Sequence, residues 1–135
     1  MEANVLLFRL QQFFPNTPDL MRHLNPGACW KYIIHEKALD NDAPELEYYL
    51  RKKENGSVEM LTRAPAEKPD LLLFFTEKAI LTLVDGAPAA DEYYARYHDV
   101  MAKPSPGVDL DNKVNKSKLH LFKMGYKMWQ EAFKF

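Results

Sequence analysis

Apolar residues recur at two different periods along the chain, and the change of period separates helices from strands. Residues 5–14 place leucine and phenylalanine on one face at helical spacing, and Asn16-Thr17-Pro18 predicts the start of a second helix. Residues 30–36 and 45–51 instead alternate apolar and polar side chains, as strands with one buried face do. Asn55-Gly56 favours a type I′ turn, so we expect the chain to reverse there into a third strand.

The second half of the chain predicts a buried strand, two helices, a last strand and a long helix. Residues 70–75 are apolar after the first position, which indicates a central strand or one covered on both faces. Thr76 is placed to cap a short helix, and another helix follows Pro88. A last strand is predicted over 108–114. Because two helices separate it from the preceding strand, we expect these strands to pair in parallel through a right-handed crossover. The final helix is predicted over 117–135.

Together these elements predict a single α+β domain over residues 1–135. Its sheet has five strands, is mixed and mostly antiparallel, and carries the helices on one face. A chain of 135 residues can bury a sizeable core without disulfide bonds or a structural metal. The lone Cys29 agrees with this expectation, since one thiol cannot form an internal bridge, and we expect it to be buried and inert.

Composition and charge narrow the classes of partner. The net charge is −1, from 18 Lys and Arg against 19 Asp and Glu, so nucleic-acid binding is not expected. No apolar run approaches the roughly 20 residues of a membrane span. The start Met1–Asn4 lacks the basic flank of a secretion signal, which predicts a cytoplasmic protein. Aromatic residues make up 13% of the chain, which predicts either a well-filled core or the walls of an apolar cavity.

The predicted C-terminal helix has an unusually wide apolar face. On one continuous helix, the apolar side chains of 117–135 cover an arc of roughly 220°, against about 100° for a surface helix. Gly125 and Ala132, the smallest residues, lie at the centre of this arc. Two interpretations compete: close contact of the helix with the sheet, or a trough for an acyl chain or another flat apolar guest.

Residues 69–86 present a distinctive order of features. Asp70 opens an apolar strand, Thr76 caps a short helix, and Gly86 ends that helix before a proline. This order resembles the most recognisable segment of the sterol carrier protein 2 family. The resemblance implies a free-standing, non-catalytic member whose sheet and helices enclose an apolar tunnel for fatty acyl chains, sterols or other lipids.

The resemblance extends from about Leu20 to Trp129 and has two departures. Residues 111–117 lack the glycines that often surround the last strand in this family. The chain also ends without the peroxisomal address seen on eukaryotic members.

Large side chains on the inward faces of the predicted elements are the candidate lining of the tunnel. We expect the ligand-binding residues to be Trp30, Tyr32, Tyr48, Phe75, Tyr97, Asn112, Leu121, Phe122, Gly125, Met128 and Trp129. Alternation turns the amide of Asn112 inward, where it bonds either a lipid head group or the backbone or water. The expected ligand is a fatty acyl chain, a sterol-like molecule or an isoprenoid, bound by burial of apolar surface.

Catalytic and metal-binding motifs are missing from the sequence. It contains no glycine-rich phosphate loop, nucleophile elbow or His-x-x-x-His pair, so neither an enzyme nor a cofactor is expected. The four histidines are scattered, and His35 and His120 fall on predicted solvent-facing sides, so no metal site is expected either. Asp109 and Asp111 are predicted to be solvated carboxylates at the edge of the sheet.

Several partners remain open at this stage, and so does the oligomeric state. The lysines of the last helix form either an ordinary solvated face or a surface for transient contact with anionic membranes: Lys116, Lys118, Lys123, Lys127 and Lys134. Val5 and Phe8 lie off the main apolar face of the first helix. They form a dimer contact, form a membrane contact, or are ordinary surface residues. The alternative function is an interaction or dimerisation module with a filled cavity, accessory to a partner enzyme. A cone-shaped isomerase or cyclase is a weaker alternative, because few acids or bases point inward.

Overall fold

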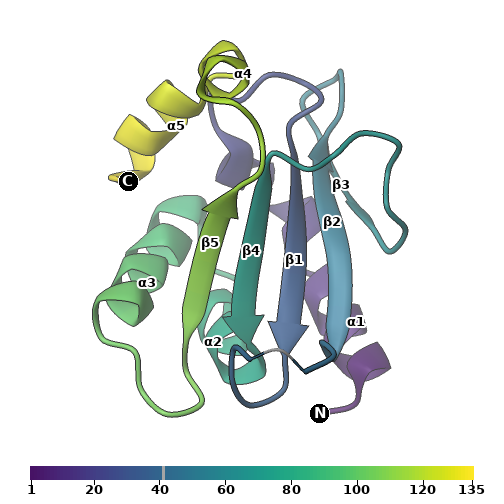
Figure 1. Ribbon diagram of the computed structural model, residues 1–135, viewed down its shortest axis with the longest axis vertical. Helices are drawn as coiled ribbons and strands as arrows, with labels where there is room; N and C mark the ends of the chain where they lie inside the picture. Colours follow the sequence, from purple (N-terminus) through teal and green to yellow (C-terminus); the bar gives the residue numbers. More distant parts are fainter. Residues whose placement is uncertain (41) are drawn as a thin grey trace.

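Five strands form one mixed sheet, and the helices cover one of its faces (Figure 1). The computed structural model describes residues 1–40 and 42–135. The strands lie in the order β3-β2-β1-β4-β5, with bounds β1 Cys29–His35, β2 Leu46–Lys52, β3 Val58–Leu61, β4 Leu71–Thr76 and β5 Leu110–Val114. The helices are α1 Ala3–Gln11, α2 Glu77–Val84, α3 Ala90–Ala102, α4 Lys118–Lys123 and α5 Tyr126–Phe133, with 3₁₀ turns η1 Phe14–Asn16 and η2 Pro18–Met21. The predicted α+β class and five-stranded mixed sheet are confirmed.

The register of the sheet gathers the alternating apolar residues on the face that the helices cover. β1 pairs antiparallel with β2 and parallel with β4, so that Tyr32 lies between Tyr48 and Leu73, and all three are buried. Lys31 faces the other side and forms an ion pair with Glu47 at 2.7 Å. The two-residue period of the sequence therefore assigns the faces of β1 and β2 correctly.

The pairing of β4 with β5 is antiparallel, which corrects the parallel crossover expected from the sequence. Together α2 and α3 return the chain to the end of the sheet at which β4 stops. β5 starts beside that end, where the Thr76 backbone N–H donates to the carbonyl oxygen of Asp109 at 3.0 Å. The parallel pair of this sheet is instead β1 with β4.

The β2–β3 hairpin reverses at Asn55-Gly56, as predicted, but its turn is not of type I′. Gly56 has a φ of +86°, whereas Asn55 does not have a positive φ. The Gly56 N–H donates to the carbonyl oxygen of Lys53, and the Lys53 N–H donates to that of Ser57. This is the pattern of a type I turn closed by a glycine in the left-handed region.

The chain between α1 and β1 is less helical than its periodicity predicts. α1 ends at Gln11, and the predicted second helix is only the 3₁₀ turn η2. Pro15 and Pro18 lack the N–H that a continuing α-helix would need, so the segment forms short turns instead. Leu20 and Met21 are nevertheless fully buried, so the apolar pattern of this segment still supplies the core.

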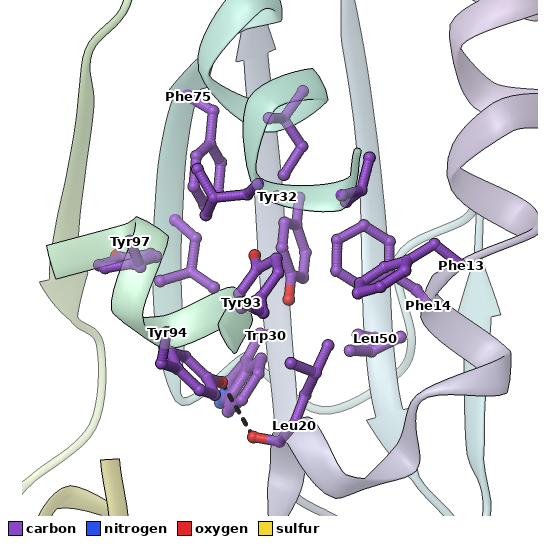
Figure 2. Close-up of a cluster of buried hydrophobic side chains, with 14 of the residues drawn as sticks. Phe13, Phe14, Leu20, Trp30, Tyr32, Leu50, Phe75, Tyr93, Tyr94 and Tyr97 are labelled. Atoms are coloured by element: carbon purple, nitrogen blue, oxygen red, sulfur yellow. Dashed lines mark hydrogen bonds between the residues drawn. The ribbon is translucent and has the colours of Figure 1, made fainter. Parts of the chain in front are cut away.

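Aromatic rings fill much of the space between the sheet and the helices (Figure 2). Tyr32 stacks on Tyr48 with 4.6 Å between ring centroids, and Phe14 lies 5.0 Å from Tyr32. Phe13 stacks on Tyr93 of α3 at 5.7 Å. Much of the aromatic content therefore serves a packed core, in which such ring pairs add stability beyond the buried area.

The C-terminal segment is two helices rather than the single helix predicted over 117–135. Gly125 separates α4 from α5 and has a φ of +95°. A Cβ atom on Gly125 would collide with the carbonyl oxygen of His23, so only glycine allows this approach. The side chain of Asn25 donates to the carbonyl oxygen of Lys123 at 2.9 Å, and its backbone N–H donates to that of Met124 at 3.0 Å.

This interruption changes which apolar residues of the segment are covered. Tyr126, Trp129 and Phe133 are buried, whereas Leu119, Phe122 and Met128 are exposed, the last two at 65% and 56%. The rest of the protein therefore covers only part of the wide apolar arc. Among the described residues, no helix is both long enough and apolar enough to cross a membrane.

Candidate functional site

A largely apolar pocket of about 440 Å³ lies between the inner face of the sheet, α3 and the two C-terminal helices. These elements lie together at the β5 side of the sheet (Figure 1). Three tyrosines of α3 belong to the pocket lining, and in Figure 2 they extend from α3 toward the sheet, with Tyr97 directed to β5. The lining consists of Trp30, Tyr32, Leu71, Leu73, Tyr93, Tyr94, Tyr97, Asn112, Val114, Lys116, Lys118, Leu121, Phe122, Tyr126, Lys127, Trp129, Gln130 and Phe135.

Seven of the eleven residues expected to contact a ligand lie on the wall of this pocket. They are Trp30, Tyr32, Tyr97, Asn112, Leu121, Phe122 and Trp129. They come from β1, α3, β5, α4 and α5, so the fold brings together residues that are about a hundred positions apart in the sequence.

The other four expected residues lie away from the pocket. Tyr48 and Phe75 point to the inner side of the sheet, but their rings pack against neighbouring aromatic rings of the core. Gly125 lies directly against the backbone carbonyl of His23, which leaves no space for a ligand there, and Met128 faces solvent. The hypothesis of a trough at Gly125 is therefore wrong: the glycine is needed for a close approach of two backbone segments.

Two tyrosines of the lining, Tyr32 and Tyr97, carry buried hydroxyl groups. The side-chain amide of Asn112 donates to the hydroxyl of Tyr97 at 3.2 Å, so one of its N–H groups has a protein partner. Burial raises the pKa of Tyr97 to about 12 and holds that of Tyr32 well above its usual range. The Tyr32 hydroxyl is buried and has no hydrogen-bond partner among the described residues. Both phenols are therefore neutral at physiological pH, and that of Tyr32 can still donate or accept a hydrogen bond.

A buried hydrogen-bond network fixes the C-terminal helices to the start of β4. Asp70 is only 2% exposed, and it accepts bonds from the hydroxyl of Tyr126 at 2.7 Å and the backbone N–H of Cys29 at 3.3 Å. Its other oxygen lies 2.9 Å from Nε2 of His120. The indole N–H of Trp30 completes the network by donating to Tyr126 at 2.9 Å. His120 is thus half-buried and bonded, not on a freely solvated face as predicted.

This network has the geometry of a structural anchor. Hydrogen bonds from neighbouring side chains and backbone occupy both carboxylate oxygens of Asp70. Burial and the adjacent Asp70 carboxylate raise the pKa of the Tyr126 phenol well above its usual range, so the phenol remains a donor to Asp70. Because these groups satisfy one another, the network positions the pocket wall made by α5.

The mouth of the pocket combines apolar and positively charged side chains. Val114 and Phe122 are exposed although they line the pocket, which therefore reaches the protein surface. Lys116, Lys118 and Lys127 are the charged side chains of the lining, which contains no Asp or Glu side chain. The lining thus combines neutral aromatic and aliphatic side chains with three ammonium groups.

Sequence reasoning missed part of this wall for identifiable reasons. Tyr93 and Tyr94 lie on the helix predicted after Pro88, and their spacing with Tyr97 places all three on the same side of α3. Tyr126 cannot be identified from the sequence, because the helix break at Gly125 decides which way it points. Asp70 opens β4 as predicted, but its burial follows only from the packing of α4 and α5.

Other reactive groups lie outside the pocket lining. Burial and the nearby Asp70 carboxylate raise the pKa of Cys29 to about 11, so its thiol stays protonated at neutral pH. Within residues 1–40 and 42–135, no group of three or more His, Cys, Asp or Glu side chains is arranged to hold a metal ion. His35 lies on the outer face of the sheet but is buried there, contrary to the predicted solvent exposure.

Comparison with known proteins yields similarity in structure only. No protein-family model matches the chain, and no curated protein sequence matches it. A solved structure described as "UbiJ-SCP2 Ubiquinone synthesis protein" is 11% identical, with a TM-score of 0.47 over 97% of this chain and 94% of that chain. The sterol carrier protein domain 2 of Helicoverpa armigera is 11% identical, with a TM-score of 0.37 over 98% of this chain and 86% of that chain. At this identity the similarity concerns the fold and carries over neither ligand nor partner.

Proposed function

We propose that this protein binds an apolar small molecule, a lipid, in the pocket between the sheet, α3 and the C-terminal helices. The observation that carries the proposal is the pocket itself: about 440 Å³ of space walled by aromatic and aliphatic side chains. That volume lies in the range of roughly 300–1,000 Å³ that small-molecule sites occupy. The ligand is a fatty acyl chain, a sterol-like molecule or an isoprenoid, and the role of the protein is to hold and transfer it.

Affinity in such a site comes from removing apolar surface from water. Each methylene group of the ligand that becomes buried contributes about 0.8 kcal/mol. Tyr97 and Asn112 are already bonded to each other, and the Asp70 network is satisfied, so neither group requires a ligand for stability. The arrangement supports reversible binding without a chemical step.

An accessory interaction module is the second candidate, and an exposed patch on α1 favours it. Val5 and Phe8 are 50% and 64% exposed, and Met1, two residues before the start of α1, is also exposed. Such side chains suit a protein contact. In this case the pocket would have no ligand, and the partner protein would bind to α1.

Uptake of a fluorescent fatty acid distinguishes the two functions. We expect saturable binding by the wild type and loss of binding in Leu121→Trp, because Leu121 lines the pocket and the larger indole would occupy it. The matched control is Met128→Trp, at an exposed position of α5 outside the pocket lining, which should bind as the wild type does. Absence of uptake by the wild type, or equal uptake by both variants, would contradict the proposal and favour the interaction module.

A further inference from the structure

We propose that the mouth of the pocket is a docking surface for an anionic lipid bilayer. The docking surface consists of Val114, Leu119 and Phe122 together with Lys116, Lys118 and Lys127. Its role in ligand exchange rests on the proposed function, but contact with a bilayer can be measured without any ligand.

Exposed apolar side chains are the first observation. Val114, Leu119 and Phe122 are 69%, 63% and 65% exposed, and Leu119 and Phe122 are one turn apart on α4. Val114 and Phe122 line the pocket, and Leu119 lies next to Phe122 on α4; exposed side chains of this size can enter the boundary between lipid head groups and acyl chains.

Uncompensated positive charge is the second observation. Residues 112–135 contain six lysines and one acidic residue, Glu131, although the whole chain has a net charge of −1. Within the part of the chain that the structure describes, Lys116, Lys118 and Lys127 form no ion pair. Their charge is therefore available to an external anionic surface, and phosphate head groups of a bilayer complement it.

Continuity with the pocket is the third observation. Val114, Phe122 and the three lysines all belong to the pocket lining, so the surface that would meet the bilayer surrounds the opening of the pocket. A lipid could then pass between pocket and bilayer without crossing water. The other exposed apolar patch, on α1, lies at the opposite end of the molecule from α4 (Figure 1) and does not border the pocket.

Co-sedimentation with vesicles tests this surface. We expect the protein to bind vesicles of phosphatidylcholine and phosphatidylglycerol at low salt, and to bind pure phosphatidylcholine vesicles much more weakly. Replacing Lys116, Lys118 and Lys127 with Gln should weaken binding on the order of a hundredfold, from the contribution typical of lysines near anionic lipid. The control variant removes the same number of positive charges outside the docking surface, by replacing the exposed Lys37, Lys53 and Lys103 with Gln. This variant should bind vesicles nearly as the wild type does.

A second pair of variants isolates the apolar contribution. Phe122→Ser should weaken vesicle binding about tenfold, whereas Phe8→Ser, at an equally exposed phenylalanine on α1, should not. Equal effects of the two lysine triples, or of the two phenylalanine variants, would overturn the proposal. Failure of the wild-type protein to bind anionic vesicles would also overturn it, and an acidic protein surface would then be the partner that fits these lysines. Fatty-acid uptake that persists in such a case would leave the proposed function intact.

Discussion

Replacing Gly125 with Ala tests the break between α4 and α5 by the sign of its effect on stability. In a continuous helix over 117–135, a central glycine would be a weak point, and alanine there would stabilise the protein by about 1 kcal/mol. In the structure, Gly125 instead has a φ of +95° and touches the backbone of His23. The same substitution must then destabilise the protein.

The expected loss has two parts. A left-handed backbone costs a residue with a Cβ atom about 1–2 kcal/mol. The Cβ atom would also push apart α4 and the segment at His23, where Asn25 holds the carbonyls of Lys123 and Met124. Losing these two hydrogen bonds costs about 1 kcal/mol each. We therefore expect the free energy of unfolding to fall by about 3–4 kcal/mol, a large share of the 5–15 kcal/mol typical of a domain.

Equilibrium unfolding in urea measures this loss, and Gly27→Ala is its matched control. Gly27 has a nearly identical φ of +96°, but a Cβ atom there would meet nothing within 4 Å. It should lose only the backbone part, about 1–2 kcal/mol. A gain of stability in Gly125→Ala, or equal losses in the two variants, would refute the close contact with His23.

Three further predictions concern the polar groups around the pocket. Asp70→Asn leaves His120 and Tyr126 with a weaker acceptor and should lower the free energy of unfolding by about 1–3 kcal/mol, measured in urea against wild type; an unchanged midpoint would contradict the network. Burial raises the pKa of six tyrosines, that of Tyr97 to about 12, so the folded state holds its phenolic protons more tightly than the unfolded chain. Stability should thus be flat up to about pH 9 and fall above pH 10, with most phenolate absorbance appearing only as the protein unfolds; early titration of all tyrosines in folded protein would argue against their burial. Finally, Asn112→Leu should shift ligand preference toward less polar lipids in a competition assay, and an unchanged preference in a folded variant would exclude a head-group contact at this amide.

Elements governed by local chemistry could be predicted from the sequence. Alternation in β1 and β2 identifies their buried faces, because the period of a strand does not depend on its partners. Thr76 caps α2 as expected, with its hydroxyl oxygen accepting the N–H of Ala79 at 3.3 Å. Gly86 ends that region with a φ of +74°.

Features that depend on distant contacts could not be predicted in this way. Whether Gly125 is a tolerated glycine within a helix or a break is decided by His23, about a hundred residues earlier. Similarly, Tyr48 and Tyr32 have the same inward parity on adjacent strands, yet only Tyr32 reaches the pocket. The strand order accounts for the difference, because β2 lies one strand farther than β1 from β5, and the pocket is on the β5 side of the sheet.

Native mass spectrometry of the freshly purified protein tests the central claim, lipid binding in the pocket, most directly. Wild-type protein should carry a stoichiometric adduct that solvent extraction releases as a lipid, and Leu121→Trp should lose it while Met128→Trp keeps it. Wild-type protein at the bare mass of the chain that also fails to take up added fatty acid would contradict the claim.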